Sequence, residues 1–95
     1  MAIVMMLEVP GGTIEQYEQA NEIMGIHGDE NAPDGLLGHV AAKTEDGVLI
    51  VDVWESQEHL DTFFRERLGD ALHQAGVPDA KPRIYPIHNA IRGRG

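Results

Sequence analysis

The chain has 95 residues, of which 7 are basic and 16 are acidic, so its formal net charge is −9. This charge repels phosphate backbones and anionic lipid headgroups, which argues against a nucleic-acid-binding or membrane-surface protein. The absence of cysteine excludes disulfides, thiolate metal sites and cysteine nucleophiles. Hydrophobic residues make up 42% of the chain, which is enough for a core. We therefore expect a single folded domain over residues 1–95.

An apolar, β-branched and methionine-rich run predicts a first strand over residues 2–9, which ends at Pro10-Gly11-Gly12. The run lacks the basic residues of a signal peptide and is too short to span a bilayer, so a cytoplasmic location is expected. Thr13 then begins a Thr-x-x-Gln capping-box pattern. Apolar residues at helical spacing predict a helix over residues 14–26, followed by a polar connection over residues 27–35.

Two further strands are predicted over residues 36–44 and 48–55. The dipeptide Asp46-Gly47 between them favours a tight hairpin turn with positive φ angles. A two-residue loop there would place residues in the following pairs across the hairpin: Glu45 with Val48, Lys43 with Ile50, Ala41 with Asp52, and His39 with Trp54.

Ser56 is the predicted cap of a second helix, whose apolar stripe runs from Leu60 to Ala75 and contains Gly69. A last strand is predicted over residues 84–91, and Pro82 and Pro86 indicate that it lies at a sheet edge or starts late. The order βαββαβ corresponds to a ferredoxin-like α+β fold, with a four-stranded antiparallel sheet and two helices on one face.

The pattern assigns different residues to the two sheet faces. A small, aliphatic set is expected under the helices: Leu36, Gly38, Val40, Ala42, Leu49, Val51 and Val53, with Ile3, Met5 and Leu7 of the first strand. A mixed set is expected on the bare face: Leu37, His39, Ala41, Ile50, Asp52 and Trp54, with Val4 and Met6. Either Tyr85 and Ile87 or Ile84 and His88 would join that face. Such an apolar face predicts a homodimer, and its polar groups predict a ligand cavity.

The hairpin over residues 38–48, and the segment Val51-Asp52-Val53-Trp54-Glu55-Ser56 leading into a helix, resemble the dimeric α/β-barrel superfamily. Within it they are most similar to small proteins of the antibiotic-biosynthesis-monooxygenase type, and the resemblance covers nearly the whole chain. It implies two sheets paired back to back and a cavity in each protomer. Members include cofactor-free oxygenases acting on polycyclic phenols, haem-degrading enzymes and isomerases of small lactones. The haem-degrading group uses an Asn on the first strand, which this chain lacks.

His39 and Asp52 are the candidate catalytic pair, because an imidazole beside a carboxylate can take a phenolic proton. The candidate substrate-binding residues are Trp54, Met6, Tyr85, His88 and Ile50. Neither a cofactor nor a metal is expected. The alternative for the same residues is structural, with His39 as a satisfied interface residue and Trp54 as part of the core.

Two classes of function follow. One is a small-molecule enzyme, most concretely a cofactor-independent monooxygenase or isomerase acting on an aromatic, polyketide-like compound. The other is a non-catalytic dimeric binding or accessory protein that uses the same cavity. In both, the expected partners are a second copy of the chain and a small apolar or aromatic ligand.

Overall fold

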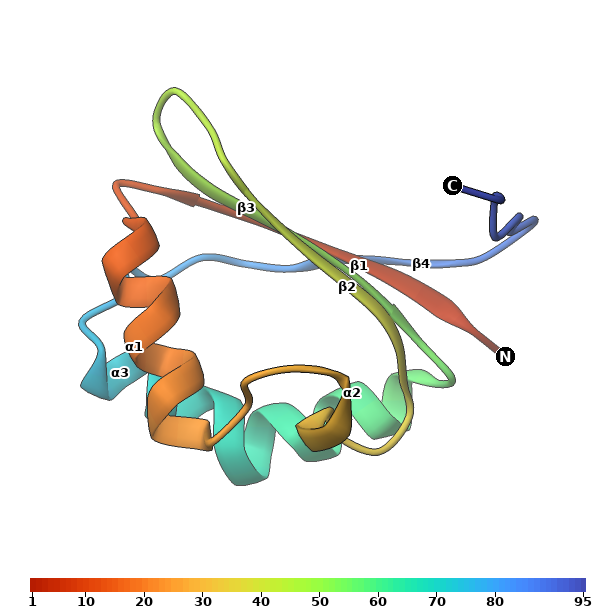
Figure 1. Ribbon diagram of the computed structural model, residues 1–95, viewed down its shortest axis with the longest axis horizontal. Helices are drawn as coiled ribbons and strands as arrows, with labels where there is room; N and C mark the ends of the chain where they lie inside the picture. The colour runs from red at the N-terminus through yellow and green to blue at the C-terminus, as the bar shows by residue number, and fades with distance from the viewer.

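The computed structural model describes residues 1–95 and confirms the predicted element order (Figure 1). The strands are β1 (Ile3–Pro10), β2 (Leu36–Lys43), β3 (Gly47–Trp54) and β4 (Arg83–Pro86). The first helix is α1 (Ile14–Met24), and a single 3-10 turn, η1 (Asp29–Asn31), follows it. The second helical segment consists of α2 (Gln57–Phe63), a π-helical turn η2 (Phe64–Leu68) and α3 (Gly69–Gln74). None of these helices combines the length and the apolar character needed to cross a membrane.

The four strands form one antiparallel sheet in the order β2-β3-β1-β4. Figure 1 shows α1 and the α2–α3 segment below this sheet, while no element covers the opposite face. The structure thus has the predicted ferredoxin-like α+β arrangement. The two central strands, β3 and β1, lie over the helices and can present their side chains to the space between the layers.

Local sequence signals fix the ends of α1. The Thr13 hydroxyl accepts from the Gln16 backbone N–H at 3.1 Å, and the Gln16 side chain accepts from the Thr13 N–H at 3.0 Å, so the capping box is complete. Gly25 ends the helix in the left-handed region, with a φ of 73°. The Gln16 side-chain amide also donates to the Gly76 carbonyl at 2.8 Å, which ties the start of α1 to the end of α3.

The predicted orientation of the hairpin faces was wrong. Trp54 is fully buried and belongs to a core cluster with Ile3, Met5 and Leu60. His39, Ile50, Asp52 and Trp54 of the mixed set therefore point toward the helices. Val40, Val51 and Val53 of the aliphatic set point outward, and Val40 is 62% exposed. The reason is that the polar members of the mixed set find hydrogen-bond partners inside the layer, which removes the cost that burying them would otherwise carry. Leu36 lies before a bulge in β2 and packs against the core cluster, as predicted.

The hairpin itself also differs from the prediction. Lys43 pairs with Val48 and His39 pairs with Asp52, a shift of two residues from the predicted register. Because the shift is even, residues predicted to share a face of the hairpin still do so. Gly47 does not have a positive φ. Instead, the turn is closed by the Thr44 N–H donating to the Gly47 carbonyl at 2.8 Å and the Gly47 N–H donating to the Thr44 hydroxyl at 3.0 Å.

The last strand is shorter than predicted, because its partner strand runs out of residues. Pro86 pairs with Ile3, the first residue of β1, and only the Ile87 N–H continues the ladder by donating to the Ala2 carbonyl at 3.0 Å. The pairing also gives the phase of the strand. Ile84 opposes Met5 and packs against the core cluster, whereas Tyr85 opposes Val4 on the outer face.

Candidate functional site

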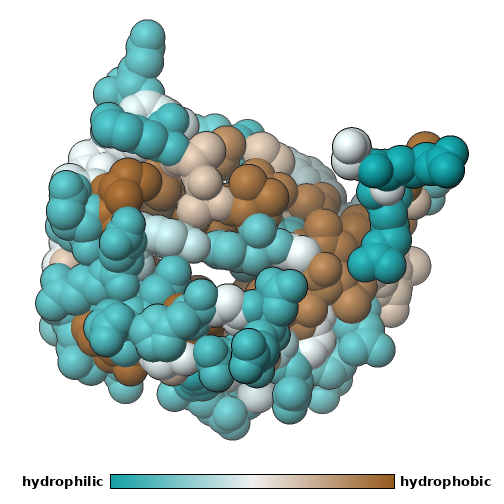
Figure 2. Space-filling model, viewed as in Figure 1, coloured by the Kyte–Doolittle hydropathy of each residue, from teal (hydrophilic) through white to brown (hydrophobic).

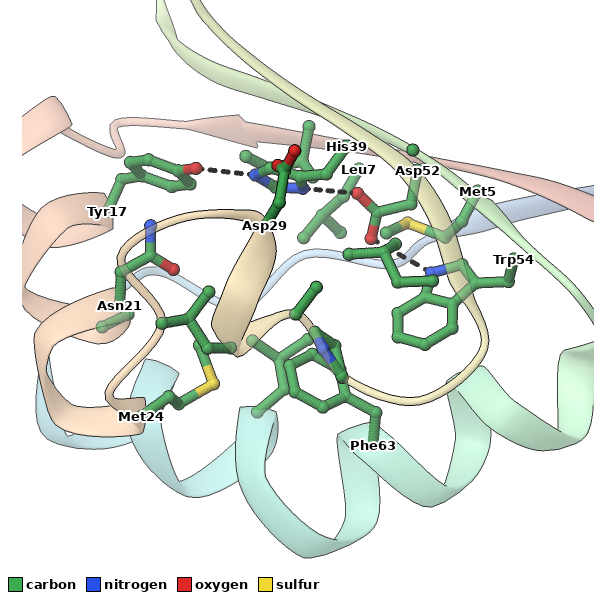
Figure 3. A pocket seen from close by; sticks show the side chains of 18 of the residues that line it. Met5, Leu7, Tyr17, Asn21, Met24, Asp29, His39, Asp52, Trp54 and Phe63 are labelled. Atoms are coloured by element: carbon green, nitrogen blue, oxygen red, sulfur yellow. Dashed lines mark hydrogen bonds and ion pairs between the residues drawn. The ribbon is translucent and has the colours of Figure 1, made fainter.

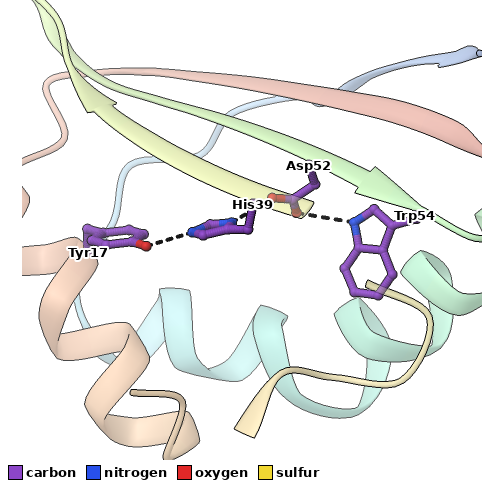
Figure 4. Close-up of polar contacts among 4 residues, drawn as sticks. All are labelled: Tyr17, His39, Asp52 and Trp54. Carbon is purple, nitrogen blue, oxygen red and sulfur yellow. Dashed lines mark hydrogen bonds and ion pairs between the residues drawn. The ribbon is translucent and has the colours of Figure 1, made fainter. Parts of the chain in front are cut away.

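Four side chains from three elements form a continuous chain of hydrogen bonds under the sheet (Figure 4). The Tyr17 hydroxyl on α1 lies 2.6 Å from Nε2 of His39 on β2. His39 Nδ1 lies 2.6 Å from Oδ1 of Asp52 on β3, and Trp54 Nε1 donates to Oδ2 of the same carboxylate at 3.1 Å. Strand pairing explains the geometry, since His39 is the direct cross-strand partner of Asp52 and Trp54 follows two residues later on the same face.

The partners determine which atoms carry the protons. An ionised carboxylate can only accept and the indole N–H can only donate, so Asp52 receives hydrogen bonds on both oxygens and holds the proton of His39 on Nδ1. In the neutral imidazole, Nε2 then keeps its lone pair and the Tyr17 hydroxyl donates to it. The arrangement therefore presents a proton acceptor, Nε2, whose orientation is set by Asp52.

The members of this hydrogen-bonded series differ in how exposed they are. Trp54 is 0% exposed and Asp52 is 5% exposed, while the His39 side chain keeps 34% of its surface accessible. The indole also packs against the Phe63 ring, with centroids 5.5 Å apart. The carboxylate is thus anchored in the core, and the imidazole reaches from it toward solvent.

A cavity of about 470 Å³ lies between the sheet, α1, the connection that contains η1, and the second helical segment (Figure 3). Of its 22 lining residues 14 are hydrophobic, so its wall is mainly apolar. Its size and character match those of small-molecule sites. Figure 2 shows its mouth as a hollow below the strands, with mostly hydrophilic residues around it. All four members of the hydrogen-bonded chain line this space.

The structure brings together some of the predicted site residues and separates the others. His39, Asp52, Trp54 and Ile50 all line the cavity. Met6, Tyr85 and His88 do not. Met6 and Tyr85 belong to the outer sheet face, because they neighbour the inward-facing Met5 and Ile84 in sequence, and His88 follows the end of β4. A substrate-binding role for these three residues has no support from their positions.

Tyr17 and Asn21 also line the cavity, although the sequence predicted them only as part of the helix over residues 14–26. They lie one turn apart on α1, and Figure 3 shows the Asn21 amide pointing into the cavity. A polar signal was present in the sequence. A tyrosine on the inward stripe of a helix requires a partner for its hydroxyl, and the aliphatic face predicted under the helices offered none, which already favoured placing His39 and Asp52 there.

No group of three or more His, Cys, Asp or Glu side chains is arranged to hold a metal ion. The chemistry that the site's own residues can perform is proton transfer: Nε2 of His39 can accept a proton, and the Asp52 carboxylate stabilises the imidazolium that results. The apolar walls limit the water that competes for such a proton.

No protein-family model and no curated protein sequence matches this chain, so its relationships come from structure. A Deinococcus radiodurans protein provisionally designated an antibiotic biosynthesis monooxygenase is similar to it over 100% of both chains, with a TM-score of 0.63 and 20% identity. The ActVA-Orf6 monooxygenase of Streptomyces coelicolor, solved in complex with Nanaomycin D, has a TM-score of 0.60 and 18% identity and covers 98% of this chain and 92% of its own.

SnoaB, a cofactor-independent oxygenase from Streptomyces nogalater, has a TM-score of 0.61 and 10% identity, with 97% of this chain and 96% of that chain covered. The structural neighbours are thus antibiotic-biosynthesis-monooxygenase-like proteins, which confirms the fold that the hairpin and the Trp-Glu-Ser segment predicted.

Proposed function

We propose that the protein is a cofactor-independent monooxygenase that acts on an aromatic, polyketide-like hydroxy compound bound in the cavity beside His39. The observation that carries this proposal is the chain Tyr17–His39–Asp52–Trp54, which places an oriented proton acceptor in the wall of a mainly apolar cavity. Two structural neighbours support the reaction class: one is named a monooxygenase and is bound to Nanaomycin D, and the other is named a cofactor-independent oxygenase.

The proposed first step is removal of a proton from the ligand's hydroxyl group. The ligand hydroxyl donates to the Tyr17 oxygen, which passes its own proton to Nε2 of His39. Tyr17 is unchanged at the end, the ligand is an electron-rich anion, and His39 is an imidazolium paired with Asp52. Burial of the Asp52 carboxylate strengthens this pairing because water screens it little.

The second step is reaction of the anion with dioxygen, the oxidant of this reaction class. In a substrate whose reactive carbon is a methylene group activated by the ring, that carbon becomes a carbonyl and keeps one oxygen atom. The other oxygen atom leaves as water with the two methylene hydrogens, and His39 returns its proton through Tyr17 to the ligand oxygen, so atoms and protons balance. The protein's contribution is the base, the fixed ligand orientation and an apolar surrounding for the anion.

A second copy of the chain is the proposed occupant of the outer sheet face. Val4, Met6, Val51 and Val53 lie there with the more exposed Val40 and Tyr85, which keep 62% and 50% of their surface accessible. An uncovered apolar sheet face of this kind is a protein-interaction surface, and pairing two such faces would bury it in both copies.

The test measures oxygen uptake with a panel of anthrone-like and hydroquinone compounds. Wild-type protein should consume oxygen, and His39→Ala should reduce the rate by about 10²-fold or more. His73→Ala removes an exposed histidine of α3 that does not line the cavity, and should leave the rate unchanged. If the wild type binds these compounds tightly but takes up no oxygen, the protein is a non-catalytic binding protein and not an enzyme. Equal rates in His39→Ala and wild type would remove His39 from the mechanism.

A further inference from the structure

Apart from its histidines, the ionisable side chains that line the cavity are acidic. Among the 22 lining residues there are two aspartates, Asp29 and Asp52, and there is no lysine or arginine. Asp52 is held by two donors inside the site. Asp29 therefore contributes the unbalanced charge of the cavity.

Asp29 stands on η1, in the connection that forms the mouth of the cavity, and Figure 3 shows its side chain projecting from this turn toward the strands. Its carboxylate does not cap the turn and takes part in none of the ion pairs of the structure. The residue is exposed, so its charge is solvated in the empty cavity. A ligand bound in the cavity therefore occupies a space that this carboxylate lines.

Arg67 and His27, two basic side chains on the segments around the cavity, are engaged with other groups. Arg67 donates to the Met24 carbonyl and stacks over the Phe63 ring at 5.7 Å from its centroid, and it is not a lining residue. His27 lies at the mouth, with Nδ1 3.8 Å from a Glu22 carboxylate oxygen, so a positive charge on its ring would be paired. Neither group is positioned as the counterion of a bound anion.

Asn21 is a lining residue that can bind a ligand through an uncharged side chain. The Asn21 side-chain amide points into the cavity and takes part in none of the side-chain hydrogen bonds of the structure. It can donate to a ligand carbonyl or accept from a ligand hydroxyl. The polar side chains of the cavity thus suit a ligand with uncharged oxygen groups. They do not suit a carboxylate, sulfonate or phosphate, which require cationic partners.

We infer that the cavity takes aromatic hydroxy compounds that are neutral or carry an amine, and that Asp29 is a specificity-determining residue against anionic ones. This inference rests on the proposed function, and it agrees with the proposed chemistry. A neutral hydroxy compound becomes an anion only after it is bound, and the proton it gives to His39 supplies the countercharge. A ligand that arrives as an anion meets Asp29 and a net protein charge of −9 without any countercharge.

The experiment compares four related ligands: naphthol, a hydroxynaphthoic acid with its carboxylate on the ring remote from the hydroxyl, the methyl ester of that acid, and the corresponding aminomethyl naphthol. The ester matches the acid in size and lacks its charge. Binding is followed at neutral pH and low salt by the fluorescence of Trp54, the only tryptophan of the chain. The acid should bind at least about tenfold more weakly than the ester, and the amine at least as tightly as naphthol.

Asp29→Asn should reduce the ratio of the dissociation constants of acid and ester, called the gap below, by roughly two- to fivefold, the range expected for one exposed charge. Glu30→Gln is the matched control, because Glu30 is the exposed neighbour of Asp29 and does not line the cavity, and it should leave the gap unchanged. Added salt should narrow the gap in the wild type as well.

Equal binding of acid and ester by the wild type would overturn the inference and leave the proposed function standing. An unchanged gap in Asp29→Asn would overturn the role of Asp29. Failure of all four ligands to bind would instead refute the aromatic ligand of the proposed function, on which the inference rests.

Discussion

His39 and Asp52 are direct partners in the β2–β3 ladder, and their side chains meet on the helix face with Nδ1 and Oδ1 2.6 Å apart. Because both residues belong to regular strands, the sheet itself fixes the distance between imidazole and carboxylate. Trp54 holds the second carboxylate oxygen, so Asp52 cannot turn away from the histidine without losing a buried hydrogen bond. The rigid pair is joined to α1 through Tyr17, whose hydroxyl lies 2.6 Å from Nε2 and whose ring is nearly parallel to the imidazole, with centroids 5.9 Å apart. The sheet therefore preorganises the imidazole, and in the proposed mechanism the helix contributes the group that receives the ligand's proton.

The first prediction concerns the tautomer of His39. Asp52→Asn keeps the shape of the side chain, but the amide oxygen must accept from Trp54 and its NH2 group then donates to Nδ1 of His39. The ring proton would move to Nε2, which can no longer accept a proton. Activity should fall by about 10²- to 10⁴-fold, while stability should fall by only about 1–2 kcal/mol.

Long-range ¹H–¹⁵N NMR of the histidine rings measures this tautomer without any ligand. The wild type should show a protonated Nδ1 and the Asp52→Asn variant a protonated Nε2. Asp29→Asn removes a lining carboxylate that forms no hydrogen bond or ion pair with His39, and should retain the wild-type pattern. A protonated Nδ1 in Asp52→Asn would contradict the proposed orientation of the base.

The second prediction concerns Tyr17 as the relay between ligand and base. Tyr17→Phe preserves the packing of the ring on α1 and removes the hydroxyl that lies 2.6 Å from Nε2. If the proton passes through this hydroxyl, the rate should fall by about 10²-fold. The tautomer of His39 should not change, because Asp52 alone determines it. A rate equal to that of the wild type would show that the ligand hydroxyl donates directly to Nε2.

Sequence patterns were sufficient for the fold and for the grouping of His39, Asp52 and Trp54, because strand alternation depends only on residue parity. They were not sufficient for the direction of that group. The expectation that Ile3 and Met5 face the helices was correct, and β1 pairs with β3 so that Ile3 opposes Trp54 and Met5 opposes Asp52. The mixed set therefore had to face the helices. This pairing joins residues far apart in the chain, so no local pattern reveals it.

The contribution of α1 to the site could not be predicted from the sequence, for a similar reason. The helix and its inward stripe were predictable from the capping box and the apolar spacing. Which sheet residue the Tyr17 hydroxyl would meet depends on how α1 crosses the sheet. That crossing is set by long-range contacts such as the packing of Ala20 on Ala71 and Ala75. Small residues at this contact allow a close approach of the helices, but they do not specify a partner for the tyrosine.

The third prediction concerns the dimer. Val40→Lys places a charge at an exposed position of the outer sheet face and should convert a dimer into a monomer, because pairing would bury the unpaired ammonium groups. Light scattering coupled to gel filtration at micromolar concentration measures the mass directly. Ile23→Lys makes the same kind of change at another exposed apolar residue, on α1 and away from that face, and should remain dimeric. A wild-type protein that is monomeric at this concentration would refute the proposed interface.

The last prediction concerns Gly47, where the hairpin leaves the sheet next to β1. A Cβ built at this position would lie 2.0 Å from the Val9 carbonyl oxygen, and that oxygen belongs to backbone that cannot move aside alone. Gly47→Ala should therefore destabilise the fold by about 2–3 kcal/mol, which lowers the melting temperature by roughly 10 °C or more in a domain of this size.

Gly28→Ala is the matched control, since its φ of 175° is extended backbone and nothing lies within 4 Å of the added methyl group. Melting is compared by circular dichroism at one protein concentration, because association with a second copy would add to the apparent stability. Failure of Gly47→Ala to fold, with normal folding of Gly28→Ala, agrees with the prediction. A melting temperature of Gly47→Ala within about 2 °C of the wild type would mean that β1 and the hairpin separate at little cost. In that case the edge of the sheet that carries the turn would be far less rigid than the ladder bearing His39 and Asp52.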